Sequence, residues 1–218
     1  MPKSKHKTKI LDSIKNTNKC QRNWLKTPVR PGDIQFFKSV LENVPKKQGQ
    51  VFHEILFIEN RGIIKKLYSY AREQDYRFAH NPQVNAPLLV VYVPYTEEHL
   101  EIISKDVLNK FNKTVNEDTT FPYYDVDITT SMGMHMGILA LAANQIGYKT
   151  GFCSCYNKKF TKLIKRLATK DEITTNGLLC LGIGYSDKTV DYNYDTALKT
   201  HIFSHENTWN DKSVRHIK

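Results

Sequence analysis

The chain has 218 residues, of which 40% are hydrophobic and 25% are charged, and its formal net charge is +10. These proportions are those of an ordinary globular protein, and they predict a single domain over residues 1–218. No apolar run approaches the roughly 20 residues that a membrane-spanning helix needs. The basic N-terminus lacks the apolar segment of a secretory signal, so we expect a cytoplasmic protein. Residues 1–9 are predicted to be flexible and residues 187–218 to form an extended tail.

The positive charge is concentrated in the first thirty residues and in the segment YNKKFTKLIKRLATK, residues 156–170. In the second segment, apolar residues lie on one face of a helix and lysines on the other, which predicts a solvent-exposed surface. The N-terminal lysines leave open a nucleic-acid-binding function. However, the chain has no zinc-ligand spacing, no aromatic RNA-recognition signature and no helix-turn-helix pattern, which argues against a nucleic-acid partner.

Helices and strands alternate along the first part of the chain. The spacing of apolar residues predicts a helix over residues 9–16 and another over residues 33–44, with Asp33 as the N-cap of the second. Alternating apolar residues predict a strand over residues 51–59. A further helix is expected over residues 63–73.

The second part of the chain begins with a run typical of a strand. Residues 86–95, APLLVVYVPY, are rich in β-formers and bounded by prolines, which predicts a buried strand. A capped helix is expected over residues 96–111, followed by a polar, irregular stretch. A long helix then begins at Asp127 or Thr129. The segment GLLCLGIGYS, residues 177–186, predicts a second buried strand, and the order of elements indicates an α+β domain with a central sheet.

The long helix contains three of the four methionines of the chain within five residues. Its large apolar residues share one face, at three- and four-residue spacing: Met132, Met136, Leu139, Ala143 and Ile146. Gly133 and Gly137 lie on a neighbouring stripe. Each glycine costs about 1 kcal/mol relative to alanine inside a helix, which indicates that another segment packs close to them. His135 is expected to be a core or interface residue and not a ligand. We therefore predict a helix that is buried nearly all round.

Four cysteines, Cys20, Cys153, Cys155 and Cys180, are too few for a disulfide framework in a chain of this size. Cys153 and Cys155 are separated by one residue, whereas the cysteines of a zinc pair are usually separated by two to four. We therefore predict reduced thiols and no metal site. No Ser/His/Asp or Cys/His set is identified either, so no catalytic side chain is predicted.

Five segments in series resemble the nitroreductase family of flavoproteins. The run GILALAANQIGYKTGFCSCYNKKFTKLIK, followed by LLCLGIGYSDK, resembles the family's alanine-rich helix, glycine turn, flavin-side segment and final strand. Gly147 matches the turn glycine, and Gly184 with Tyr185 matches the end of the strand. Upstream, NKCQRNWLKTPVRPGDIQFFKSVLENVP resembles the N-terminal basic signature, PKKQGQVFHEILFIEN the polar stretch before the first strand, and NPQVNAPLLVV the Asn/Gln segment before the second. The likeness runs from Ile10 to Ser186.

The resemblance implies an α+β fold of the nitroreductase type, with a central, mainly antiparallel sheet flanked by helices. It also implies a homodimer that binds flavin mononucleotide (FMN) at its interface, with both subunits lining each pocket. The expected activity is that of an NAD(P)H-dependent FMN oxidoreductase. NADH or NADPH would reduce the flavin, and a small organic acceptor, such as a nitroaromatic or a quinone, would then oxidise it. Such hydride transfer needs no general acid or nucleophile from the protein.

The same resemblance implies three groups of cofactor-binding residues. The FMN phosphate end would be held by the N-terminal signature, the loop after the second helix and the tail, with the residues Asn18, Lys19, Cys20, Arg22, Lys46, Lys47, Lys212 and Arg215. Arginine suits this role because its planar guanidinium binds phosphate at two points. Asn81 and Gln83 would pair with the pyrimidine edge of the ring. Phe152, Cys153 and Ser154 would lie beside the reactive nitrogen.

Departures from the family pattern leave other functions open. Asn18 stands where the family has the first arginine of its basic pair, and Lys46 and Lys47 stand where serines are common. One alternative is a specialised branch of the fold, such as a dehalogenase or a flavin-fragmenting enzyme, with a short lid over residues 106–127. Another is a member that has kept the fold and lost the flavin. A basic nucleic-acid-binding protein is the alternative from a different class.

Overall fold

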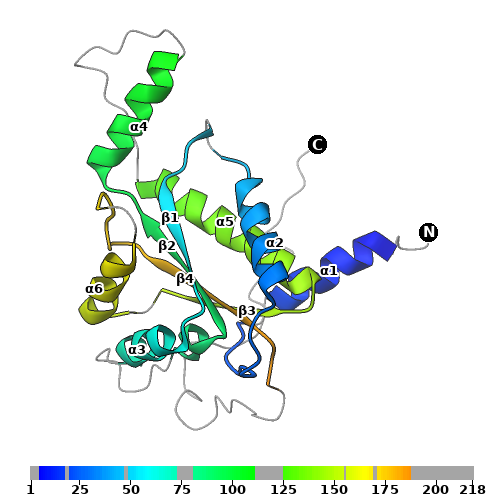
Figure 1. Cartoon of the computed structure of the whole chain (residues 1–218). Helices are drawn as coiled ribbons and strands as arrows, with labels where there is room; N and C mark the ends of the chain where they lie inside the picture. The colour runs from blue at the N-terminus through cyan, green and yellow to red at the C-terminus, as the bar shows by residue number, and fades with distance from the viewer. Residues whose placement is uncertain are drawn as a thin grey trace, which may run out of the picture.

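The computed structural model describes residues 5–17, 20–46, 49–72, 81–110, 125–154, 156–168 and 171–187. One four-stranded sheet lies at the centre of the described residues, with helices on both sides (Figure 1). The strands are β1 (His53–Ile58), β2 (Leu88–Pro94), β3 (Lys149–Cys153) and β4 (Leu179–Gly184). Their order is β1-β2-β4-β3, and each neighbouring pair is antiparallel. The predicted α+β fold with an antiparallel central sheet is therefore confirmed.

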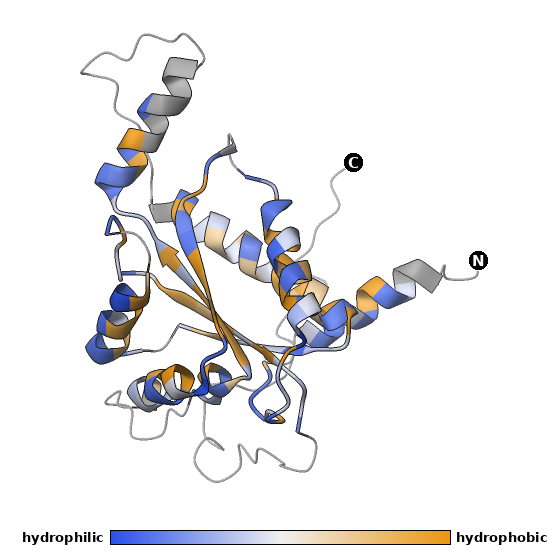
Figure 2. Cartoon of the chain, in the orientation of Figure 1, coloured by the Kyte–Doolittle hydropathy of each residue, from blue (hydrophilic) through white to orange (hydrophobic). Residues whose placement is uncertain are grey.

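Helices cover both faces of this sheet. The described helices are α1 (Lys5–Thr17), α2 (Pro31–Glu42), α3 (Arg61–Arg72), the short 3₁₀ helix η2 (Pro82–Asn85), α4 (Glu97–Lys110), α5 (Asp125–Gln145) and α6 (Lys158–Leu167). α1 and α2 pack against α5 on one side of the sheet, whereas α3 and α6 pack against each other on the other side (Figure 1). As a result every residue of β2 is buried, and Figure 2 shows the central strands as largely hydrophobic. None of the described helices is long and apolar enough to cross a membrane.

The starts of the first two helices differ from the prediction. α1 begins at Lys5, so residues 5–9, which belong to the segment predicted to be flexible, are helical. Asp33 is not the N-cap of α2, because this helix begins at Pro31 with Arg30 in the N-cap position. Proline suits the first helical position, since its φ is preset and it lacks an N–H that would have no partner there. Asp33 lies instead in the first turn, where the helix dipole favours a carboxylate.

The pattern of apolar residues does not predict β3. The strand has five residues, lies at the edge of the sheet and contains Gly151, which gives it no side chain to pack at its centre. Its strand conformation is defined by the ladder with β4, which pairs Thr150 with Ile183 and Phe152 with Leu181. Pairing between segments that are distant in the sequence therefore decides this element.

α5 has two distinct faces. Met132, Leu139 and Ala143 are buried, as predicted. Gly133 and Gly137 are exposed, and no described atom lies within 4 Å of the position that a Cβ would take at either residue. The prediction that the helix is buried nearly all round is therefore wrong for a single chain. Any segment that packs closely against the two glycines lies outside the described residues of this chain.

Tyr148 links the start of α2 to the turn between α5 and β3. Its side chain is buried, and its hydroxyl donates to Asp33 Oδ2 at 2.6 Å, the same oxygen that accepts from Arg30 Nε at 2.6 Å. The rings of Phe37 and Tyr185 pack on Tyr148, with centroid distances of 5.8 Å and 4.6 Å. The pKa of Asp33 is held below its usual value, because the Tyr148 hydroxyl and then the Arg30 guanidinium stabilise its charged form.

Replacing Tyr148 by phenylalanine should lower the free energy of unfolding by about 1–2 kcal/mol, because it removes a hydrogen bond to a carboxylate and keeps the ring. Urea unfolding followed by circular dichroism measures this change. In a double-mutant cycle with Asp33→Ala, the two losses should be less than additive, since both substitutions remove the same contact. Fully additive losses would show that the hydroxyl and the carboxylate do not interact.

Candidate functional site

Three segments that are distant in the sequence meet on one face of the sheet. They are residues 20–24, residues 81–86 and the strands β3 and β4. The backbone N–H of Gln21 donates to the carbonyl oxygen of Thr150 at 2.8 Å, which ties the first segment to β3. Trp24 Nε1 donates to the carbonyl oxygen of Pro82 at 2.8 Å, which ties the first segment to η2. We call this meeting point the three-segment junction, and each of its parts carries a share of the resemblance to nitroreductases.

Two glycines make the close approach possible. Gly151 of β3 and Gly182 of β4 are opposite each other in the ladder, so both would present a side chain to the same face. A Cβ on Gly151 would overlap the carbonyl oxygen of Gln21. A Cβ on Gly182 would overlap the carbonyl oxygen of Gln83 and lie 2.8 Å from Ala86 Cβ. Any side chain at these two positions would therefore push the loops off the sheet.

Several of the predicted cofactor-binding residues lie together in the three-segment junction. Cys20 Sγ lies 3.5 Å from the carbonyl oxygen of Phe152 and 3.5 Å from Gln83 Nε2. Arg22 follows Cys20 by two residues and is half-buried. Ser154 directly follows β3 and is exposed. The structure thus brings the N-terminal signature, the Asn/Gln segment and the predicted flavin-side segment to one place.

Asn81, Cys153 and Lys46 have other surroundings than Cys20. Asn81 is buried and its Nδ2 donates to the carbonyl oxygen of Ala71 at 2.8 Å, so this amide nitrogen stabilises the last turn of α3. Cys153 is buried opposite Cys180 in the sheet, and Lys46 is half-buried before a turn. The predictions that lie outside the described residues concern Asn18, Lys19, Lys47, Lys212 and Arg215.

Gln21 is a residue of the three-segment junction that the sequence does not single out. Besides its backbone bond to β3, its Nε2 donates to the carbonyl oxygen of Asn23 at 2.6 Å and to Ser186 Oγ at 3.1 Å. The second bond joins the N-terminal segment to the residues that follow β4. The role of Gln21 depends on contacts with distant segments, which the sequence does not show. The one signal in the sequence is its place between Cys20 and Arg22.

The cysteines of the described residues are thiols. This holds for Cys20, which is half-buried, and for Cys153 and Cys180, which are buried. Within the same residues, no group of three or more His, Cys, Asp or Glu side chains could hold a metal ion.

One atom of the three-segment junction fits the edge of a flavin ring. Gln83 is 4% exposed and its Nε2 is directed at Cys20, but its Oε1 is buried and has no hydrogen-bond partner among the described residues. A buried acceptor without a donor costs about 1–3 kcal/mol. The pyrimidine edge of FMN carries an N–H group that would satisfy such an acceptor.

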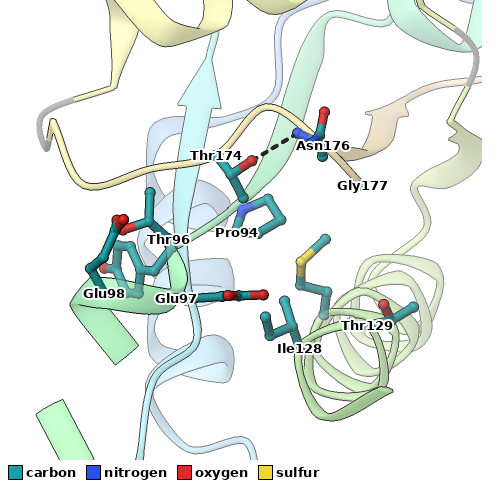
Figure 3. Close-up of a pocket in the computed structure, with 11 residues that line it drawn as sticks. Pro94, Thr96, Glu97, Glu98, Ile128, Thr129, Thr174, Asn176 and Gly177 are labelled. Atoms are coloured by element: carbon teal, nitrogen blue, oxygen red, sulfur yellow. Dashed lines mark hydrogen bonds between the residues drawn. The ribbon is translucent and has the colours of Figure 1, made fainter. Parts of the chain in front are cut away.

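A separate pocket of about 550 Å³ lies at the other end of β2, where α4 and α5 begin (Figure 3). In Figure 3 the side chain of Glu97 points toward Ile128, and Thr174 Oγ1 accepts from the backbone N–H of Asn176 at 3.2 Å. The lining consists of Pro94, Tyr95, Thr96, Glu97, Glu98, Ile128, Thr129, Met132, Thr174, Asn176 and Gly177. None of the predicted cofactor-binding residues is in this lining, so this pocket and the three-segment junction are different sites.

Comparison with known proteins shows which fold these segments share. No protein-family model matches the chain, and no curated protein shows significant sequence similarity to it. Solved structures do match. A nitroreductase from Bacteroides fragilis with bound FMN superposes with a TM-score of 0.63 at 12% identity, over 96% of this chain and 98% of that chain. The chain has the nitroreductase fold.

Two further nitroreductases superpose in the same way. The match to a nitroreductase from B. subtilis has a TM-score of 0.62 at 14% identity, over 93% of this chain and 75% of that one. The match to nitroreductase A from Vibrio parahaemolyticus has a TM-score of 0.59 at 14% identity, over 83% of this chain and 68% of that one. At these identities most side chains differ, so the shared property is the arrangement of the sheet and the helices. The fold implied by the five sequence segments is confirmed.

The contact over the glycines can be tested by adding one methyl group. Gly182→Ala should destabilise the protein by about 3 kcal/mol or more, because the methyl group meets backbone and not a flexible side chain. Gly32→Ala is the matched control, since no atom lies within 4 Å of its Cβ position. Thermal unfolding of the two variants measures the difference. If Gly182→Ala were as stable as Gly32→Ala, η2 would not be packed on β4.

Proposed function

We propose that the protein is an FMN-dependent oxidoreductase of the nitroreductase type, which passes hydride from NADH or NADPH through the flavin to a small organic acceptor. Its likeness to a nitroreductase with bound FMN supports this proposal. The observation that carries it is the three-segment junction, where segments predicted to bind FMN meet and leave a buried acceptor, Gln83 Oε1, without a donor. We further propose that residues 1–218 form one domain that acts in the cytoplasm, where thiols such as Cys20 stay reduced.

Bound FMN would supply the hydride chemistry, and the chain would hold it in position. Gln83 would accept a hydrogen bond from the pyrimidine edge of the ring through Oε1. Arg22 would hold the phosphate, because a guanidinium donates two parallel hydrogen bonds to it and keeps its charge at every physiological pH. The backbone from Phe152 to Ser154 would lie beside the ring and exclude water from one side. The other cations of the predicted set are Lys19, Lys46, Lys47, Lys212 and Arg215.

We also propose that the protein is a homodimer, formed through the exposed face of α5. Gly133 and Gly137 leave room there for a second backbone. α1 packs against α5 and exposes about half of each of its apolar residues Ile10, Leu11 and Ile14. A second copy of the chain would cover both surfaces, and an isologous contact of this kind explains why the helix carries glycines that cost it stability.

Purified protein should be yellow, and its flavin absorption should bleach when NADH or NADPH is added under anaerobic conditions. Addition of a nitroaromatic or a quinone should restore the absorption. Colourless protein that cannot be reconstituted with FMN would contradict the proposal and favour a flavin-free member of the fold. Colourless protein that binds DNA with a steep salt dependence would favour the nucleic-acid alternative.

Arg22→Ala should weaken FMN binding roughly tenfold or more, since a charge-assisted hydrogen bond to the phosphate is lost. Lys26→Ala is the matched control, because Lys26 is an exposed cation of the same segment. Fluorescence titration with FMN gives both dissociation constants. Equal constants for the two variants would remove Arg22 from the binding site.

Gly137→Leu should convert the dimer into a monomer, because a large side chain would prevent close approach of the second copy. Size-exclusion chromatography with light scattering measures the mass, and Ser69→Leu, on the exposed surface of α3 across the sheet, is the control. A variant that stays dimeric would place the interface elsewhere. A wild-type protein that is monomeric at all concentrations would contradict the dimer itself.

A further inference from the structure

Four polar residues lie together in the core between the sheet and α5. They are His53 on β1, Tyr92 on β2, and Ser131 and His135 on α5. Their exposed fractions are 1%, 0%, 4% and 3%, respectively. The ring centroids of His53 and His135 are 4.9 Å apart, with an edge-to-face angle of 84°, and those of His53 and Tyr92 are 5.7 Å apart. The two histidines are therefore in contact and shielded from water.

Most of the polar atoms in this cluster have no partner among the described residues. Both ring nitrogens of His53, the Tyr92 hydroxyl and Ser131 Oγ are buried without a hydrogen bond. His135 Nδ1 lies 2.7 Å from the carbonyl oxygen of Ser131. Because a carbonyl oxygen only accepts, this nitrogen carries the proton and Nε2 is the basic nitrogen of His135. The packing thus holds the His53 ring in the protein interior, with no hydrogen-bond partner for either nitrogen among the described residues.

The surroundings offer no compensation for a positive charge on these rings. From β2 the group that faces His53 is the neutral Tyr92, and from α5 it is His135. Asp127 is on the same stripe of α5, but it precedes His135 by eight residues, which is about 12 Å along the helix axis. On α2, Lys38 Nζ lies 6.0 Å from the ring centre of Phe57, farther along β1, and Glu42, the last residue of the helix, is exposed to solvent.

Burial, and then the charge of the neighbouring imidazole, lowers the pKa of His53 from 6.5 to about 3. The folded form therefore binds a proton far less readily than the open form. Above pH 6.5, His53 is neutral in both the folded and the open form, so the packing contributes its full stability. As the pH falls from 6.5 towards 3, protons bind to the open form alone, so stability is lost over that range.

We propose that the contact of His53 with His135 forms an acid-sensitive latch between β1 and α5, which holds while the His53 ring is neutral and releases α5 when this ring takes up a proton. α5 is the helix whose outer face carries Gly133 and Gly137. If the proposed function holds, release of this helix would separate the two subunits and expel FMN. The latch itself depends only on the core of one chain.

The latch is tested first on the wild-type protein without flavin. Its melting temperature should be about 5 °C lower at pH 5.0 than at pH 7.5 because of His53. Hydrogen exchange of the α5 amides, corrected for the intrinsic rate at each pH, should rise over the same range and exceed that of α3. An α5 that exchanges equally slowly at pH 7.5 and pH 5.0 would overturn the proposal.

Variants identify the groups that carry the effect. His53→Phe should keep an apolar ring in the core and lose most of the drop in melting temperature between pH 7.5 and pH 5.0. His135→Leu should reduce the drop only in part, because the burial of His53 remains. His99→Phe is the matched control, because His99 on α4 also packs edge-to-face on a tyrosine, Tyr95, with centroids 4.8 Å apart, but is only half-buried. A drop that persists in His53→Phe, or that disappears in His99→Phe, would overturn the assignment.

Two further measurements distinguish the latch from a metal site and from simple loss of flavin. If EDTA lowered the melting temperature at pH 7.5 as much as acid does, the ring nitrogens would be metal ligands and the latch would be wrong. FMN fluorescence measures flavin release between pH 7.5 and pH 5.0. A protein that never binds FMN but shows acid-dependent opening of α5 would contradict the proposed function and support the latch. A protein that binds FMN but whose α5 exchanges equally slowly at both pH values would support the proposed function and contradict the latch.

Discussion

The molecule depends on direct contact between the backbones of two loops and the face of the sheet over Gly151 and Gly182. A sheet face normally presents side chains that keep neighbouring segments about 10 Å away. Here the missing side chains let the carbonyl oxygens of Gln21 and Gln83 lie against β3 and β4. Arg22 directly follows Gln21, so its place beside the sheet is set by this backbone contact and not by its charge. The candidate site therefore depends on the facing glycines of β3 and β4, which let the loop that carries Arg22 pack on the sheet.

The elements that bury a continuous apolar surface could be predicted from the sequence. β2 is buried on both faces and reads as an unbroken apolar run, and α5 is a long apolar segment in which Met132, Leu139 and Ala143 are buried. The parts that could not be predicted depend on partners far along the chain. β3 exists through its ladder with β4, and the start of α2 is decided by Pro31 and not by Asp33.

The candidate site shows the same division. The resemblance to nitroreductases predicted Cys20, Gln83 and Phe152 as cofactor-binding residues, and the structure brings them together. The resemblance could not show that Asn81 directs its amide nitrogen to the last turn of α3, because that contact depends on where the helix ends in space. The burial of His135 was expected, but its contact with His53 could not be predicted. That contact depends on which helix covers the inward face of β1.

α5 is held at two places by groups that acid weakens. At its middle, His135 contacts His53, and a neutral His53 ring is needed there. Just after its end, Tyr148 donates to Asp33, and a charged carboxylate is needed there. The pKa values of His53 and Asp33 are lowered in the folded chain, so protonation of either group opposes folding. The histidine contact weakens first, since its ordinary pKa of 6.5 is well above the 3.8 of the carboxyl. If release of the inner contact moves this 21-residue helix as one body, its outer, glycine-bearing face moves with it. The proposed latch in the core would then be coupled to the proposed dimer surface through α5.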